Sequence, residues 1–359
     1  MMVSRNNFDF LRVALALFVV FAHSRLIGQV SPLSFQTLNF YGFIAVQCFF
    51  VISGFLIFQS WDNAKSLREY VSKRVRRIYP AYFVVVVGCA FLGGLISTMP
   101  LAEYFGSAAW FKYLVANLTF LNFLQPTLPG VFLDGDDSLV NGPLWTIKVE
   151  VMFYTAVPII AWLAAGRRKP FVFFVIYVAS VAWAEFFRYL YDVSGNGLYL
   201  TLVRQLPGQL ALFIAGGALY FYFDYFKERA AFLLVVSIGF LALHSFYPLP
   251  WIYPAALGIV VIYVAQLAPY FGNFGQYGDF SYGIYILHYP VLQSVRALGI
   301  FETSPIVALA MGGLITVLLA YLSWNLIEKP ALLSSSHYRR ATEKKYAWGQ
   351  NDSVTATAE

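Results

Sequence analysis

The sequence contains little charge and almost no cysteine. Asp, Glu, Lys and Arg make up only 12% of its 359 residues, about half of the share that soluble domains carry. Both cysteines, Cys48 and Cys89, fall in apolar segments, so they give no basis for a disulfide framework or a metal cluster. The four histidines lack the spacing of a zinc site. These scarcities argue against a soluble enzyme, a disulfide-rich secreted domain and a zinc protein.

Long apolar runs dominate the chain, and 60% of the residues are hydrophobic. A helix needs about 20 apolar residues to cross the hydrocarbon core of a bilayer. Ten runs approach or reach this length: Phe8–Ile27, Tyr41–Trp61, Tyr79–Ile96, Leu144–Ala165, Phe171–Tyr191, Gln205–Phe223, Ala230–His244, Trp251–Ala268, Phe280–Leu298 and Ile306–Ile327. We therefore predict an all-α, polytopic membrane helical bundle of about ten transmembrane helices over residues 1–330. Residues 331–359 are expected to form a polar, disordered cytoplasmic tail.

The basic residues are distributed unevenly between the loops. Most of the 24 lysines and arginines lie in loops on the side of the N-terminus, including the clusters at 65–77 and 167–169. Positive residues mark cytoplasmic loops, so both termini are predicted to be cytoplasmic. The net charge of +6 is then a topology signal and does not indicate nucleic-acid binding.

Ionisable residues stand inside several of the predicted spans. Arg12 and His23 are eleven positions apart, which places both on one helix face, about 16 Å apart along the axis. Residues of this kind within a span indicate a functional site. Counting from the span ends places His23 level with Glu150. The same count places Ser53 level with His288. Alternatively, Arg12 snorkels to the inner headgroups and His23 is a packing residue.

Other polar residues also allow a structural and a functional interpretation. Ser53, beside Gly54, is typical of close helix packing. Arg74 and Arg77 lie at the predicted cytoplasmic mouth, where they would either anchor lipid headgroups or bind phosphate through guanidinium forks. One helix face forms either a hydrogen-bonded seam or a substrate-lining wall, and its members are Ser281, Tyr285 and His288.

Six segments follow one another in the order of a known family. They are FDFLRVALALFVVFAHS (8–24), FFVISGFLIF (49–58), RVRRIYPAY (74–82), GPLWTIKVEVMFY (142–154), SYGIYILHYPV (281–291) and NLIEKP (325–330). Through them the chain resembles the acyltransferase-3 family, bacterial integral-membrane acyltransferases that modify surface glycans. It departs from the family pattern where Val151 follows Glu150 in place of a second acidic residue, and where Lys148 replaces a small or apolar residue.

The resemblance implies a multi-pass enzyme of the bacterial inner (plasma) membrane. Such an enzyme moves an acyl group, most often acetyl, from cytosolic acyl-CoA to a sugar hydroxyl of a lipid-linked or surface glycan, such as O-antigen or exopolysaccharide. No metal is implied. We expect no extracytoplasmic hydrolase-like domain of the kind that many members carry, so the chain resembles the stand-alone type, which transfers directly or through a separate extracytoplasmic transferase.

The resemblance also suggests roles for individual residues. Arg74 and Arg77 are expected to hold the CoA phosphates. His23 would act as the general base or carry the acyl group, and Arg12 would stabilise the oxyanion. Glu150 would orient the imidazole. The residues expected to line the substrate path are Ser53, Tyr154, Tyr285 and His288.

Two other classes of protein fit the same set of polar residues within the predicted spans. A flippase for a glycan or a lipid-linked sugar would use it without an acyl donor, so CoA binding separates the two classes. A lipid-binding scaffold predicts that single intramembrane substitutions are silent.

Overall fold

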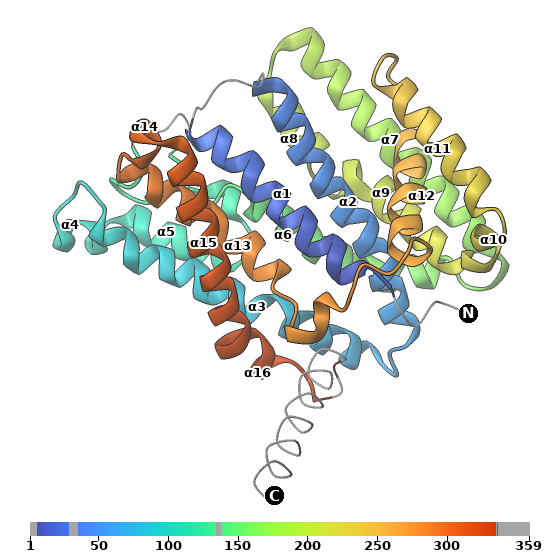
Figure 1. Ribbon diagram of the computed structural model, residues 1–359, viewed down its shortest axis with the longest axis horizontal. Helices are drawn as coiled ribbons and strands as arrows, with labels where there is room; N and C mark the ends of the chain where they lie inside the picture. The colour runs from blue at the N-terminus through green and yellow to red at the C-terminus, as the bar shows by residue number, and fades with distance from the viewer. Residues whose placement is uncertain (1–5, 29–34, 134–137, 335, 337–359) are drawn as a thin grey trace, which may run out of the picture. The chain divides into compact units, whose positions relative to one another are not determined.

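The computed structural model describes residues 6–28, 35–133, 138–334 and 336, and most of the predicted tail lies outside them. The described residues form helices and loops without a strand (Figure 1), which confirms the all-α prediction. The chain divides into two compact units. Unit 1 comprises residues 1–11, 43–71 and 146–271, and unit 2 comprises residues 12–42, 72–145 and 272–359.

Each predicted apolar run is found as a helix. The ten helices are α1 (Phe8–Gly28), α2 (Phe35–Asp62), α3 (Leu67–Leu92), α6 (Leu144–Leu163), α7 (Lys169–Ser194), α9 (Leu206–Phe221), α11 (Ala230–His244), α12 (Tyr253–Gln266), α13 (Ser281–Ala297) and α15 (Pro305–Ser323). Seven helical segments of the described chain are long and apolar enough to cross a membrane, while α11 and α12 are shorter. The number of crossings and their direction stay predictions.

Small residues bring the helices of unit 1 close together. A Cβ atom at Gly54 of α2 would meet the carbonyl oxygen of Phe213 of α9, and one at Gly216 of α9 would meet the carbonyl oxygen of Val51. Such contacts between backbones are typical of packing inside membranes. The helix α9 also contacts α7 and α12, and the short helices α8 (Gly197–Val203) and α10 (Phe223–Glu228) flank it.

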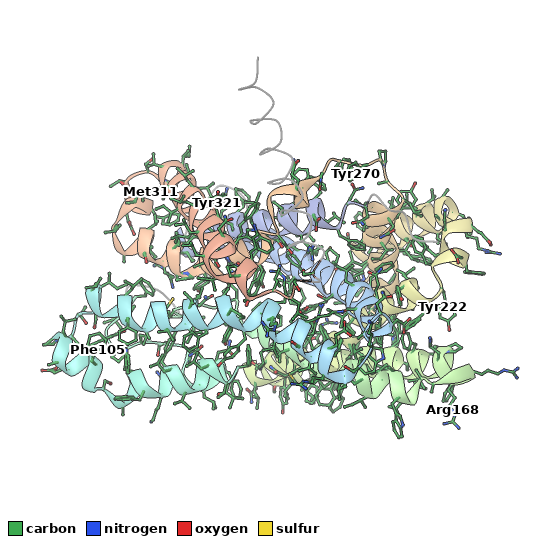
Figure 2. The ribbon with its side chains drawn as sticks, turned by 90° about the horizontal axis from the view of Figure 1, so that it is seen from below. Phe105, Arg168, Tyr222, Tyr270, Met311 and Tyr321 are labelled. Carbon is green, nitrogen blue, oxygen red and sulfur yellow. The ribbon has the colours of Figure 1, made fainter. Side chains whose placement is uncertain are left out.

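Unit 2 is built on α13 and α15, which lie side by side (Figure 1). Gly283 of α13 packs against Ala320 of α15. Figure 2 shows Met311 and Tyr321 along α15, and Phe105 in the last turn of α4 (Leu101–Gly106), which precedes α5 (Ala108–Leu118). After α15 the chain continues through a π-helical turn, Trp324–Glu328, into α16 (Lys329–Ala331). Turns of this rare kind often occur at functional sites.

Candidate functional site

Two histidines from distant parts of the chain meet within unit 2. Nε2 of His288 in α13 lies 3.0 Å from Nδ1 of His23 in α1. Nδ1 of His288 lies 2.7 Å from the carbonyl oxygen of Tyr285. The ring of Tyr289 stands edge-on to the His23 ring, 5.4 Å between centroids. His288 is fully buried, so the pair lies among packed helices of unit 2.

The hydrogen bonds of this pair fix which nitrogen atoms carry protons. A carbonyl oxygen only accepts, so Nδ1 of His288 donates to Tyr285. In neutral His288, Nε2 then holds a lone pair and accepts from Nδ1–H of His23. In neutral His23, Nε2 then carries a lone pair. That atom can take a proton or attack an acyl carbon.

A network of buried charges lies at the start of α13, also within unit 2. Nη2 of Arg77 in α3 donates to Asp279 at 2.6 Å, and Nη1 donates to Glu328 at 2.9 Å. Nη2 of Arg12 in α1 lies 3.4 Å from the same Asp279 oxygen. Asp279 also accepts from the backbone N–H and the hydroxyl of Ser281. Both carboxylates are almost fully buried. The network therefore ties α1, α3 and the π-helical turn to the start of α13.

The arginines keep Asp279 ionised. Burial by itself would raise the pKa of this carboxyl, but the charges of Arg12 and Arg77 and the hydrogen bonds from Ser281 outweigh burial and lower the pKa to about 2. The carboxylate is therefore negative throughout the physiological range.

Arg77 is less available for phosphate than the sequence suggested. Its guanidinium holds two buried carboxylates and lies over the rings of Tyr282 and Trp324. A phosphate would have to displace one of these ion pairs. Arg74 lies one helical turn earlier on α3 and is half-buried. Arg12 has Asp279 as an ion-pair partner, so snorkelling is not its whole role.

A second polar pair lies within unit 1. The hydroxyl of Ser53 in α2 donates to both carboxylate oxygens of Glu150 in α6, at 2.8 and 2.9 Å. Nζ of Lys148 donates to the side chain of Gln205 at 2.6 Å. The carbonyl oxygen of Tyr154 accepts from the hydroxyl of Tyr70, which fixes α6 against α3 at this level. Ser53 is thus a hydrogen-bond partner of a membrane carboxylate and not only a packing residue.

The depths counted from the span ends are wrong for both pairs. The count placed Ser53 roughly 9 Å from Glu150 along the membrane normal, and His23 roughly 10 Å from His288. Instead, a hydrogen bond joins each pair: Oγ of Ser53 lies 2.8 Å from Oε1 of Glu150, and Nδ1 of His23 lies 3.0 Å from Nε2 of His288. The predicted orientation of His23 by Glu150 was based on that count and stays a prediction.

The error in unit 2 has a simple cause. Asp279, just before α13, is buried beside Arg12, a full turn inside α1. The helix α13 therefore begins level with the second turn of α1, whereas the count took both helices to begin at the same edge. His288 follows Asp279 by about 13 Å and His23 follows Arg12 by about 16 Å of helix, which brings the two rings level.

Sequence reasoning missed the carboxylates that hold the arginines. Asp279 stands two residues before Ser281, the spacing of a side chain that caps a helix start. Glu328 lies at the end of the last apolar run, in NLIEKP. A buried arginine needs an acidic partner. The presence of Arg12 and Arg77 was therefore the signal from which Asp279 and Glu328 could have been found. The carbonyl oxygen of Tyr285 accepts from Nδ1 of His288, and the predicted lining role of the Tyr285 side chain stays a prediction.

Comparison with known proteins gives a consistent result. The family described as an acyltransferase domain, acyltransferase-3, matches residues 5–325. Nodulation protein 10 of Rhizobium leguminosarum bv. viciae is 29% identical over 355 residues, covering 91% of this chain and 93% of the relative. The O-acetyl transferase of Shigella phage Sf6 is 27% identical over 345 residues, covering 92% and 97%.

A third relative is longer than this chain. The O-acetyltransferase OatA of Staphylococcus aureus (strain NCTC 8325 / PS 47) is 23% identical over 332 residues, covering 80% of this chain and 52% of the relative. No solved structure matches the chain. The apolar helices, the family match and these relatives together support a membrane O-acetyltransferase. The chain belongs to the acyltransferase-3 family.

Proposed function

We propose that this protein is a multi-pass O-acetyltransferase of the bacterial inner membrane. It moves acetyl from cytosolic acetyl-CoA to a sugar hydroxyl of a lipid-linked or surface glycan. The observation that carries the proposal is the hydrogen-bonded pair of His23 and His288, which presents a basic nitrogen inside a chain of the acyltransferase-3 family. Acetyl transfer to an oxygen accords with the names of two relatives as O-acetyl transferases, and the glycan acceptor is the expectation from the family resemblance.

The histidine pair supplies the proton transfers. Nε2 of His23 takes the proton of the acceptor hydroxyl while the oxygen attacks the thioester carbonyl. The C–O bond forms, the C–S bond breaks, and the CoA thiolate receives the proton from the imidazolium. His288 accepts from Nδ1–H of His23, so it holds the ring in place and stabilises the imidazolium, the role of the carboxylate in a serine-protease triad.

The charged residues position this chemistry. Arg74 binds the CoA phosphates, as a guanidinium fork suits them. Arg77 acts as a positioning residue, because it joins α3 to Asp279 at the start of the helix that carries His288. In unit 1, the predicted lining roles of Ser53 and Tyr154 and the predicted orienting role of Glu150 stay predictions.

Acyl transfer by purified protein tests the proposed function. Protein in vesicles is supplied with acetyl-CoA labelled in the acetyl group and with glycan lipid extracted from a host that lacks the gene. We expect label to appear in an alkali-labile ester on the glycan, as measured by mass spectrometry. Movement of glycan across the vesicle membrane without any need for acetyl-CoA would instead identify a flippase and overturn the proposal.

Substitution of His288 tests its positioning role. We expect His288→Leu to lower kcat about 10- to 100-fold with little change in KM, since the loss of a partner that orients a functional histidine has effects of this size. His288→Gln should retain most activity, because its amide oxygen can accept from Nδ1–H of His23. Equal loss in both variants, or a change confined to KM, would contradict this role.

A further inference from the structure

Unit 1 contains an apolar cavity that the proposed chemistry does not use. It has a volume of about 370 Å³ and lies between α7, α9, α10, α11 and α12. Its lining is almost wholly hydrocarbon and aromatic and includes Phe173, Ala218, Tyr225, Phe226 and Ile259. A volume in this range fits a small-molecule ligand, and a wall of this composition suits a hydrocarbon chain.

Basic side chains gather at one end of the cavity. Pro170 lines the cavity directly after Arg167, Arg168 and Lys169. Figure 2 shows Arg168 projecting beyond the start of α7, with Tyr222, a lining residue, at the same end of the unit. On the facing side, Lys227 follows the lining residue Phe226. Nζ of Lys169 lies 3.5 Å from the centre of the Phe221 ring.

A second cavity adjoins the basic end. It measures about 300 Å³, shares Phe173 with the first cavity and is bordered by Lys169 and Asp62. Its lining is far more polar. Acidic residues nearby are already engaged: Asp62 accepts from Tyr220, and Glu228 pairs with Arg229. Asp224 is exposed on α10. An apolar cavity thus opens at one end beside a polar cavity with a basic border.

This pairing of a hydrocarbon wall with a basic border has the chemistry of an anionic lipid. Basic pockets between helices on the cytoplasmic side bind anionic headgroups, and the clusters at 167–169 and 227–229 both fall on the predicted cytoplasmic side. A zwitterionic lipid would bind through contact with the apolar wall, but the basic border would add little to its affinity. A soluble anion would leave the apolar cavity unused.

We propose that unit 1 binds an anionic phospholipid of the cytoplasmic leaflet, with one acyl chain in the cavity lined by Phe173 and Ala218 and its phosphate against Arg168 and Lys169. This site is separate from the histidine pair and does not depend on the acyl-transfer proposal. It is a lipid-binding site on an enzyme whose two reactants are expected to be acetyl-CoA and a glycan.

Native mass spectrometry of the full-length protein, titrated with phosphatidylglycerol or phosphatidylethanolamine, tests the proposal. We expect tighter binding of phosphatidylglycerol. The double variant Arg168→Gln/Lys169→Gln should weaken the binding of phosphatidylglycerol by at least about fivefold and leave the binding of phosphatidylethanolamine unchanged. One basic residue near a membrane surface contributes about this factor to binding. Lys65→Gln, an exposed basic residue that lines neither cavity, is the matched control.

A second variant tests the apolar part of the site. Ala218→Phe places a ring in the cavity and should reduce binding of both lipids, whereas Val235→Phe, on an exposed part of α11, should not. Circular dichroism and melting temperature verify that each variant is folded. Equal affinity for the two lipids, or unchanged binding by Ala218→Phe, would overturn the proposal. If Ala218→Phe instead converted a dimer to a monomer and left lipid binding unchanged, a second copy of the chain would occupy the cavity and the proposal would be wrong. Displacement of phosphatidylglycerol by an equimolar polyprenyl phosphate would also overturn it.

Discussion

Replacement of His23 by glutamine should abolish acetyl transfer while leaving the protein folded. The amide group of glutamine can still donate to Nε2 of His288, so the contact between α1 and α13 is kept. It cannot take a proton from a hydroxyl at neutral pH. A general base contributes about 10²- to 10⁴-fold to a rate, and we expect a loss in that range. Ester-linked acetyl on the host glycan, measured at matched membrane levels, provides the readout.

His244 offers a matched control for this experiment. It ends α11 in unit 1, and its Nδ1 accepts from the backbone N–H of Leu249, so it takes no part in the pair. The His244→Gln variant should give the same amount of ester-linked acetyl on the host glycan as the wild-type protein. If His23→Gln retained normal acetylation, His23 would have no chemical role. If it failed to accumulate in the membrane, the His23–His288 contact would be chiefly structural.

Replacement of Asp279 by asparagine should destabilise the protein more than any exposed substitution. The change leaves the positive charges of Arg12 and Arg77 facing a neutral group in a buried setting. Removing one partner of a buried ion pair costs about 3–5 kcal/mol. We expect a strongly lowered melting temperature in detergent, measured by intrinsic fluorescence. Arg12→Gln should cost less, because Asp279 then keeps its shorter contact with Arg77.

Acid should act on the same carboxylate. The pKa of Asp279, about 2 in the folded protein, lies below the value of about 3.9 expected for an unfolded chain. Its contribution to stability is therefore fully present above about pH 4 and is lost as the pH falls towards 2. Asp279→Asn should remove this part of the acid dependence, while Asp192→Asn, at an exposed site on α7, should preserve it. A melting temperature of Asp279→Asn equal to that of wild type would contradict the role of the network.

The sequence predicted the helices well because hydropathy and helix length are local properties. The runs at Ala230–His244 and Phe8–Ile27 became α11 and α1 with ends that differ by at most one residue. It also indicated His23 and Arg12 as candidate site residues, since an ionisable residue within an apolar run is visible without knowledge of the fold, and their roles stay predictions.

Partners were harder to predict than positions. A depth counted from span ends is right only if every helix begins at the membrane edge, and α13 instead begins level with the second turn of α1. This offset between α13 and α1 brings His288 level with His23. Asp279 lies in a connecting segment, where an acidic residue is ordinarily solvated, so only the fold shows that it is buried between arginines.

The π-helical turn at Trp324–Glu328 determines where one carboxylate points. A π-helical turn holds one residue more than the α-helical turn it replaces. Shortening this stretch by a residue would rotate everything after it by about 100°. Glu328 would then leave the face on which it meets Arg77 and Ser323. Leu326 in this turn is exposed, so core packing of its side chain does not account for the extra residue. The length of the turn therefore determines the direction in which the Glu328 side chain points.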